Sequence, residues 1–513
     1  MSDLYGVERL PLPRAQEMAD IDRRAREEHG IPERLLMESA GRAIAMVVQA
    51  LYPEGTVAAA VGSGHNGADA YIALRALKSW GREVRAIQAG SQPPDRALAH
   101  RWDLPVEPVE GSAEAVFCTA DVILDGLLGT GTAGAPHERA TQMIEAMNGS
   151  RAARVAVDGP SGIDFSTGAV PGACFRADVT VTLGYPKVGL LFQPARSRCG
   201  RIIAAEIGFQ PVADDEVSAF VLTPDWARAF RPRRAPDAHK GDAGYLLIAA
   251  GRSGMSGAAV LAARGALAMG AGIVRIASDS ANRRICQTAV PEAIFVDIDD
   301  DGAMAEAGEW AHAVVVGPGF GRDKRAQLRL DRVFETTGAL PTLIDADGLN
   351  MFAGRSDALA QLAKSRPVAI TPHPGEMARL LGVNTEGIVR DPVAVAASAA
   401  QQLRAAVLLK GAPSVVALSH EPVLVSAATS SAAASGGSGD VLSGACGAML
   451  AARMPRREAL GVALFYCARA AMLGPPIGRS SLEVVSDLPA ALETPGAETP
   501  ILPFVVFDQP PPR

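Results

Sequence analysis

Short apolar runs alternate along the chain with longer stretches in which apolar residues recur every three or four positions. In the first half, the runs have the length of β-strands and lie at 56–61, 121–125, 153–158, 177–183 and 201–207. Helical spacing is clearest after Pro32, where an apolar stripe extends from Leu36 to Leu51. Apolar strands that alternate with helices are typical of parallel sheets covered on both faces. The first half is therefore predicted to be a doubly wound α/β domain.

The second half repeats this pattern of an apolar strand followed by a polar or glycine-rich loop. The repeats lie at 239–251, 311–322, 341–350, 367–382 and 406–416. They predict a second α/β domain with a mainly parallel sheet and helices on both faces.

The join between the halves is marked by a stretch poor in strands, residues 211–238, which contains FRPRRAPDAHK. Basic residues and prolines in such a stretch indicate a linker. The last residues, which end in DQPPPR, are Pro-rich and are expected to be disordered. The expected organisation is a domain at 1–215, a linker at 216–235, a second domain at 236–492 and a tail at 493–513.

Composition narrows the class of protein. With 48% apolar and 20% charged residues among 513, the chain has enough apolar material for large cores. A net charge of −7 gives no general attraction for nucleic acid or anionic lipid. The six cysteines show no CxxC spacing, and no run of about 18 apolar residues occurs. These features favour a soluble cytoplasmic protein with reduced thiols.

The stretch 430–450 surrounds one carboxylate with small residues. Gly436, Gly437 and Gly439 allow backbone amides to approach a ligand closely. A helix that begins near Asp440 would direct its free amides toward an anion, and Asp440 could act as a base on a hydroxyl held beside a phosphate. The alternative is a glycine-rich turn capped by an aspartate.

Polar side chains also follow strands in the first half. Asn66, Asp125 and Ser161 each lie in a loop after an apolar run, and such loops meet at one edge of a doubly wound sheet. Their oxygen atoms suit an alkali or alkaline-earth cation, whereas no His/Cys cluster predicts zinc. Because Asp, Asn and Ser also favour turns, three strand-end caps explain the same pattern.

Two residues of the second half end strands in the same way. His373 lies between two prolines in TPHPGE, and Lys410 ends the apolar run AVLLK. Both are expected at the sheet edge that carries Asp440. A hydrogen-bonding surface histidine and a lysine that extends into solvent are the simpler alternatives.

The first half resembles the NAD(P)H-hydrate epimerase domain over residues 10–210. The resemblance rests on GHNGADA, DGLLGTG, VDGPSGID and TLGYPKVGLL in this order. It implies a Rossmann-like domain, a potassium ion held by Asn66, Asp125 and Ser161, and Asp158 acting on the hydrated nicotinamide ring. Lys187 matches a family lysine. The implied substrate contacts are His65, Asn66, Gly67, Ala68, Asp69, Gly129, Thr130, Gly131, Thr132, Ala133, Gly134, Ala135 and Asp158.

Four positions depart from the family pattern. His65 stands where Asn is usual, Ala68 and Ala70 where Gly is usual, and Gly159 where a branched apolar residue precedes Pro160. A methyl group in a tight turn can narrow a pocket or disfavour positive φ. These positions put epimerase activity, more than the fold, in question.

The second half resembles the ribokinase-like ADP- or ATP-dependent NAD(P)H-hydrate dehydratase domain over about 235–490. The motifs are HKGDAG, GPGFGR, DADGLN, TPHPGEMARL, LLKG and GGSGDVLSG. The resemblance implies that Asp440 is catalytic. The implied contacts to the hydrated cofactor are Ala243, Gly319, His373 and Asp440, and those to the nucleotide are Lys410, Gly411, Ala412, Pro413, Ser414 and Gly439.

Together the two resemblances imply repair of hydrated NADH and NADPH by a fused bacterial-type enzyme. The first domain would interconvert the R and S hydrates, and the second would dehydrate the S hydrate while ADP becomes AMP and phosphate. Mg²⁺ is expected with the nucleotide; ATP in place of ADP, and a homo-oligomer, stay open. The alternative is a ribokinase-like kinase for a small alcohol, such as a thiamine precursor, with a non-catalytic nucleotide-binding N-terminal module.

Overall fold

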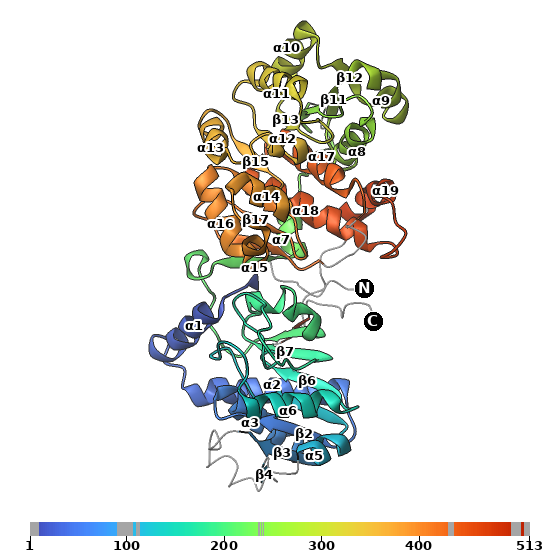
Figure 1. The fold of residues 1–513 in the computed structure, drawn as a ribbon. Coiled ribbons are helices and arrows are strands. Elements are labelled where there is room, and N and C mark those ends of the chain that lie inside the picture. The colour runs from blue at the N-terminus through green and yellow to red at the C-terminus, as the bar shows by residue number, and fades with distance from the viewer. Residues whose placement is uncertain are drawn as a thin grey trace. The chain divides into compact units, whose positions relative to one another are not determined.

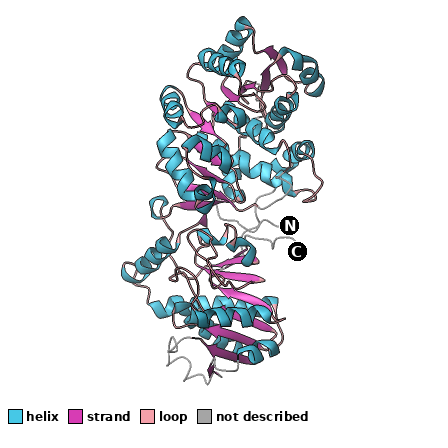
Figure 2. Ribbon diagram, viewed as in Figure 1, coloured by secondary structure: helices cyan, strands magenta, loops and turns pink. Residues whose placement is uncertain are grey.

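The structure is a computed structural model that describes residues 10–89, 106–108, 113–233, 236–237, 239, 241–428, 435–493 and 504–506. The chain divides into two compact units. Unit 1 comprises Met1–Phe220 with Ala497–Arg513, and unit 2 comprises Val221–Gly496. Each unit is built from a sheet with helices packed against it (Figure 1; Figure 2).

Unit 1 contains the following elements. Its strands are β1 (Leu10–Pro11), β2 (Val57–Val61), β3 (Val84–Gln88), β4 (Val106–Pro108), β5 (Val122–Gly126), β6 (Ala153–Val157), β7 (Val179–Leu183), β8 (Arg201–Ala205) and β19 (Phe504–Val506). Its helices are α1 (Ala15–Glu27), α2 (Glu33–Leu51), α3 (His65–Ser79), α5 (Ala113–Thr119) and α6 (Glu138–Gly149), with short 3₁₀ turns η1 (Val188–Leu190), η2 (Ala195–Arg198) and η3 (Asp214–Glu216).

The sheet of unit 1 has the strand order β19-β8-β7-β6-β5-β2-β3-β4. The strands β2 to β8 pair in parallel, and the predicted apolar runs of the first half form β2, β5, β6, β7 and β8. Both faces are covered, because α2 and α3 share one buried apolar cluster with the sheet and α5 and α6 share the other. The expected doubly wound domain is confirmed.

Unit 2 contains more elements. Its strands are β9 (Ala219–Leu222), β10 (Tyr245–Ala249), β11 (Ile273–Ser278), β12 (Ile294–Asp297), β13 (Ala313–Val316), β14 (Thr342–Ile344), β15 (Val368–Ile370), β16 (Ala406–Leu409), β17 (Val415–Ala417) and β18 (Val423–Ser426). Its helices are α7 (Pro224–Phe230), α8 (Ser256–Ala268), α9 (Arg283–Ala289), α10 (Asp301–Trp310), α11 (Lys324–Thr337), α12 (Ala346–Asn350), α13 (Ser356–Ser365), α14 (Pro374–Leu381), α15 (Thr385–Arg390), α16 (Pro392–Leu403), α17 (Ser438–Ala451), α18 (Arg456–Met472) and α19 (Ser481–Leu492), with the 3₁₀ turn η4 (Ser280–Asn282).

The sheet of unit 2 runs in the order β9-β18-β17-β16-β15-β14-β13-β10-β11-β12. Strands β10 to β16 pair in parallel, so the loops after them gather at one edge. The strands β16, β17 and β18 pair antiparallel and extend the sheet on one side. The mainly parallel sheet agrees with the prediction.

Helices α8 and α17 approach each other closely enough to exclude side chains. A Cβ on Gly444 of α17 would overlap the carbonyl oxygen of Ala262 in α8, and a Cβ on Gly265 would lie 2.5 Å from the carbonyl oxygen of Val441. The small residues of both helices are therefore a packing requirement. Because Val441 is next to Asp440, this packing fixes the start of α17 relative to α8.

Two segments differ from the sequence interpretation. The stretch 216–235, expected to be a linker, contains β9 and α7, where Thr223 caps α7 by accepting a hydrogen bond from Trp226 N at 3.1 Å. In the tail, expected to be disordered, β19 pairs antiparallel with β8; the other residues from 494 onward lie outside the described part. Strands β9 and β19 have only four and three residues, so their apolar runs are too short to predict a strand.

Candidate active sites

Three polar side chains at the carboxyl edge of the unit 1 sheet meet around the backbone of Leu128. Asn66 Nδ2 donates to the carbonyl oxygen of Leu128 at 3.0 Å, and Leu128 N donates to Ser161 Oγ at 2.9 Å. Ser161 donates to Asp125 twice, from Oγ to Oδ1 at 2.6 Å and from N to Oδ2 at 2.7 Å. The structure thus brings together the three residues predicted to form a cation site.

The electrostatics of Asp125 suit a cation. Its side chain is fully buried, and burial raises its pKa to about 6, although hydrogen bonds from Ser161 and Leu127 oppose the shift. In the described ranges no lysine or arginine pairs with this carboxylate, so its charge is balanced only by hydrogen-bond donors. Carboxylate, hydroxyl and amide oxygens are the donors that hard cations prefer.

Asp158 follows β6 directly and is held from several sides. Its φ is +64°, which is uncommon for a residue with a Cβ and marks a constrained position. Its Oδ1 accepts hydrogen bonds from Leu183 N at 2.9 Å, from Thr182 Oγ1 at 3.3 Å and from Lys187 Nζ. Lys187 is buried, and its Nζ also donates to the carbonyl oxygen of Leu183 at 2.9 Å. The lysine matched by motif is therefore the ionic partner of the predicted catalytic carboxylate.

Asp69 is a further buried carboxyl in this region. It lies in α3, its side chain is buried, and its Oδ1 has no hydrogen-bond partner among the described residues. Burial raises its pKa well above the usual range; the charges of Asp158 and Asp22 act in the same direction, while Lys187 opposes them. A raised pKa makes a carboxyl better suited to carry and donate a proton. The motif predicts Asp69 only as a substrate contact, because burial is not visible in a motif.

The loop 129–135 lines a cavity of about 170 Å³ beside Leu128. Gly129, the segment 132–135, Gly162 and Phe165 contribute to its walls, whereas Thr130 and Gly131 do not. His65 lies outside this cavity: its side chain is 73% exposed, and its Nε2 is 2.9 Å from Glu33 Oε1. In unit 1, the predicted substrate contacts therefore do not all lie at one cavity.

The departures from the family pattern are accommodated by the fold. GHNGADA is not an irregular loop, because α3 begins at His65, so Ala68 and Ala70 are helical and neither has a positive φ. Alanine is the most favourable residue at such positions. At Gly159, a Cβ would overlap the ring of Phe165, which fills the space that a branched side chain would need. The concern that alanine strains a tight turn is therefore wrong.

In unit 2, Asp440 lies in the first turn of α17, as predicted. The helix follows Gly437, whose φ is +88°. Burial, together with the charges of Asp345 and Asp347, raises the pKa of Asp440 to about 6, although Lys410 opposes the shift. A carboxyl with this pKa is largely ionised at pH 7 and still basic enough to take a hydroxyl proton. The positive dipole end of a helix N-terminus favours an anion at this place.

An ion-pair network that the sequence does not predict lies beside Asp440. Lys410 Nζ lies 2.9 Å from Asp345 Oδ1 and 3.8 Å from Glu376 Oε2, and the other oxygen of Asp345 accepts a hydrogen bond from Ser443 Oγ in α17. These carboxylates raise the pKa of Lys410 although burial opposes them. A Cβ on Gly439 would lie 3.7 Å from Lys410 Nζ, which places Lys410 beside the glycine turn rather than in solvent.

His373 has a structural role in addition to any contact with substrate. It is the N-cap of α14, and its Nδ1 accepts hydrogen bonds from Gly375 N at 3.0 Å and Glu376 N at 3.4 Å. Glu376 Oε2 accepts in return from His373 N at 2.9 Å, so the two residues form a capping box. Half of the His373 side chain remains exposed, with Nε2 3.5 Å from Glu376 Oε1.

The predicted nucleotide segment 410–414 directly follows β16. Lys410 N donates to the carbonyl oxygen of Pro372 at 2.8 Å, which joins this segment to the His373 loop. Ser414 Oγ bridges the turn by accepting from Gly411 N and donating to Gly411 O, both at 3.0 Å. The segment therefore lies at the same edge as Asp440 in a closed turn.

The predicted substrate contact Ala243 lies far from Asp440. Ala243 precedes β10 at the amino end of the sheet, and a Cβ on the next residue, Gly244, would overlap the carbonyl oxygen of Ala451. Asp440 lies at the opposite end of α17, about 16 Å away at the rise of an α-helix. The alanine beside the Gly319 loop is Ala258, whose Cβ would lie 2.9 Å from a Cβ on Gly319.

Two general features bear on ligands. In the part of the chain that the structure describes, no three His, Cys, Asp or Glu side chains are grouped so that they could hold a metal ion. No helix within the described ranges is long and apolar enough to cross a membrane.

Known proteins match the sequence of both units. The family model described as NAD(P)H-hydrate dehydratase matches residues 246–475, and that described as YjeF-related protein N-terminus matches residues 33–189. The bifunctional NAD(P)H-hydrate repair enzyme of Salinibacter ruber is 35% identical over 494 residues, 88% of this chain and 90% of that protein. The enzyme of the same name from Escherichia coli is 35% identical over 451 residues, 87% of this chain and 86% of that protein.

Solved structures include the ADP/ATP-dependent NAD(P)H-hydrate dehydratase of Bacillus subtilis co-crystallised with ATP and Mg²⁺. It is 27% identical with a TM-score of 0.47, over 53% of this chain and 96% of that chain. A third sequence relative is the bifunctional NAD(P)H-hydrate repair enzyme of Gloeobacter violaceus. It is 37% identical over 472 residues, 86% of this chain and 89% of that protein. The sequence matches show that the chain belongs to the family of bifunctional NAD(P)H-hydrate repair enzymes, which combine an epimerase with a dehydratase.

Proposed function

We propose that unit 1 interconverts the R and S hydrates of NADH and NADPH and that unit 2 dehydrates the S hydrate while ADP becomes AMP and phosphate. The observation that carries the second half is Asp440, a mostly buried carboxyl with a pKa of about 6 at the N-terminus of α17. A base and an anion-binding helix end at one place are what transfer of a phosphoryl group to a hydroxyl requires.

The dehydration follows from this arrangement in two stages. Asp440 takes the proton of the substrate hydroxyl while the hydroxyl oxygen forms a bond to the terminal phosphorus of ADP. The bond between that phosphorus and the bridging oxygen of ADP breaks, which releases AMP. The ring nitrogen then expels phosphate from the neighbouring carbon, and loss of a proton restores the dihydropyridine. Lys410 beside Gly439 supplies positive charge where the transferred group would gain negative charge.

Mg²⁺ neutralises nucleotide phosphate charge when it is bound. Asp345 and Glu376 carry carboxylate oxygens of the type that Mg²⁺ binds, and both carboxylates form ion pairs with Lys410. Because no ready group of acidic ligands is present among the described residues, most of the ligands would come from the nucleotide. The chain itself holds Lys410 and Asp440 in fixed positions relative to each other.

The epimerase proposal rests on Asp158, Lys187 and Asp69. The hydroxyl carbon of the hydrate is next to the ring nitrogen, so opening the carbon–nitrogen bond and closing it again inverts that carbon. Asp158, kept in place by Lys187, would take the hydroxyl proton, and the buried carboxyl of Asp69 would return a proton to the nitrogen. Asn66, Asp125 and Ser161 would hold K⁺, whose positive charge would balance the buried Asp125.

The proposal is tested by incubating the full chain with hydrated NADH and ADP or ATP. Recovery of dihydronicotinamide absorbance, with free phosphate and AMP in equal amounts, is expected with ADP. A stable phosphorylated substrate would instead identify a small-alcohol kinase. ATP-only activity would correct the nucleotide and leave the reaction in place.

A further inference from the structure

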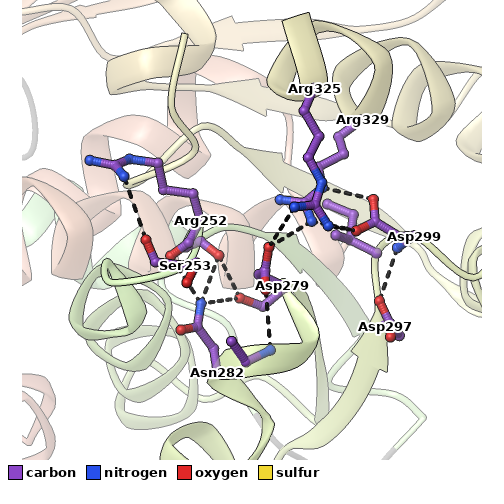
Figure 3. Close-up of polar contacts among 12 residues, drawn as sticks. Arg252, Ser253, Asp279, Asn282, Asp297, Asp299, Arg325 and Arg329 are labelled. Atoms are coloured by element: carbon purple, nitrogen blue, oxygen red, sulfur yellow. Dashed lines mark hydrogen bonds and ion pairs between the residues drawn. The ribbon is translucent and has the colours of Figure 1, made fainter. Parts of the chain in front are cut away.

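The loop after β10 is fixed from below by buried polar side chains (Figure 3). Asn282 is 2% exposed, and its Nδ2 donates to the carbonyl oxygens of Gly251 at 2.8 Å and Arg252 at 3.1 Å. Ser278 Oγ donates to the same Gly251 oxygen at 2.7 Å. The backbone of Arg252 is therefore held in one position, although its side chain is exposed.

The same loop is bonded to the glycine segment 317–321. Arg252 N donates to the carbonyl oxygen of Gly319 at 2.7 Å, and Gly251 N donates to that of Pro318 at 2.9 Å. A Cβ on Gly321 would lie 2.9 Å from Arg252 Cδ, so the arginine stem covers Gly321. Met255 flanks Gly319 on this surface and is 43% exposed. A fixed arginine and an exposed thioether thus border the loop that the proposed function assigns to the hydrate.

The Arg252 guanidinium differs from its neighbours in having no acidic partner among the described residues. The Arg252 Nη1 atom donates a hydrogen bond to the carbonyl oxygen of Ser253 at 3.5 Å. Arg329, in contrast, is bound to Asp279 at 2.8 Å and to Asp299, and Arg325 lies 2.6 Å from Asp299. Figure 3 shows the Arg252 side chain extending away from this acidic cluster.

We propose that Arg252 binds a phosphate group of the hydrated dinucleotide in the dehydratase site. The inference rests on the proposed function, because it assumes that the Gly319 loop receives the hydrate. A planar guanidinium with free donors binds phosphate oxygens in pairs, and Arg252 needs no prior ion pair to be broken. The phosphate is either part of the pyrophosphate, present in both substrates, or the additional phosphate of the NADPH form.

The test compares Arg252→Gln with the unaltered full chain. The KM for the S hydrate of NADPH is expected to rise about tenfold, with kcat and the KM for ADP within twofold of the unaltered values. An equal rise for the NADH hydrate assigns the pyrophosphate, and an unchanged KM for the NADH hydrate assigns the additional phosphate of the NADPH form. Arg252→Lys, which keeps the charge but not the paired donors, should recover part of the loss. The effect should shrink at high salt, because ions screen an exposed contact.

Arg325→Gln is the matched control, since it removes the same charge from the same region but from a guanidinium already paired with Asp299. Its KM values should stay unchanged. Unchanged hydrate KM values in Arg252→Gln, or a rise in the nucleotide KM alone, would overturn the proposal. Binding of each hydrate without nucleotide, measured by calorimetry, keeps the inference separate from turnover. If the unaltered chain did not turn over the hydrate, the proposed dehydratase function would be contradicted. If the unaltered chain and Arg252→Gln bound the hydrate with equal affinity, the proposed phosphate contact of Arg252 would be contradicted.

Discussion

Lys410 and Asp345 form a largely buried ion pair, with Nζ 2.9 Å from Oδ1, beside the candidate base Asp440. The two residues act on Asp440 in opposite directions, because Asp345 raises its pKa and Lys410 lowers it. Ser443, in the same helix as Asp440, donates to the second oxygen of Asp345. The network thus connects the predicted nucleotide segment to the helix that carries the base.

Lys410→Met should shift the pH profile of dehydration. Without the ammonium, the pKa of Asp440 rises above about 6, so the acid limb of kcat/KM moves to higher pH and activity at pH 7 falls at least tenfold. Lys364→Met, a change of the same size at an exposed helical position, is the control. Dehydratase profiles of both variants would decide; an unchanged acid limb in Lys410→Met would show that the pair does not tune the base.

Asp440→Asn should abolish dehydration without destabilising the protein. The rate that depends on a base with a pKa of about 6 falls about tenfold per pH unit below that value. The amide of Asn cannot act as a base at any pH, so the dehydration rate should fall by about a hundredfold or more. Because the folded-state pKa is raised, the charged form opposes folding, and stability is lost as pH rises through about 6. The melting temperature of the variant at pH 7 should therefore equal or exceed that of the unaltered chain. A clear drop would mean that the carboxylate supports the fold.

Much of the fold could be predicted, because its strands are uninterrupted apolar runs of ordinary length. The antiparallel pairing of β17 and β18 and the strand β19 have no comparable signal, since three or four residues carry too little pattern. At the sites, Asp158 and Asp440 end or follow predictable elements. Asp345 and Glu376 were not identified because their importance depends on contacts between loops far apart in sequence. The separation of Ala243 from Asp440 could not be predicted, because a motif does not state which end of a strand faces the ligand.

Asp125→Asn should remove the dependence of epimerisation on cations. The amide keeps the shape and a hydrogen-bond acceptor for Ser161, but it lacks the buried charge that a cation would balance. Epimer interconversion is measured by NMR in KCl and in tetramethylammonium chloride. The unaltered chain should be faster in KCl, and the variant equally slow in both. If the variant kept the potassium response, these residues would be strand-end caps.

Asp69→Asn should slow epimerisation at least tenfold while dehydration stays unchanged. The substitution retains size but removes the carboxyl that would donate the proton. Asp22→Asn, which removes a nearby charge paired with Arg26 2.9 Å away, is the matched control and should stay active. Epimerisation at the unaltered rate in Asp69→Asn would leave Asp69 a substrate contact only.

The central claim, two separate sites acting in sequence on one substrate, is tested most directly by following both hydrate epimers by NMR in the full chain. Asp158→Asn with ADP should consume the S hydrate and leave the R hydrate to decline only at the spontaneous rate. Asp440→Asn should consume neither, yet equilibrate a pure epimer as fast as the unaltered chain. Loss of both activities in either folded variant, or equal consumption of both epimers by Asp158→Asn, would contradict the account.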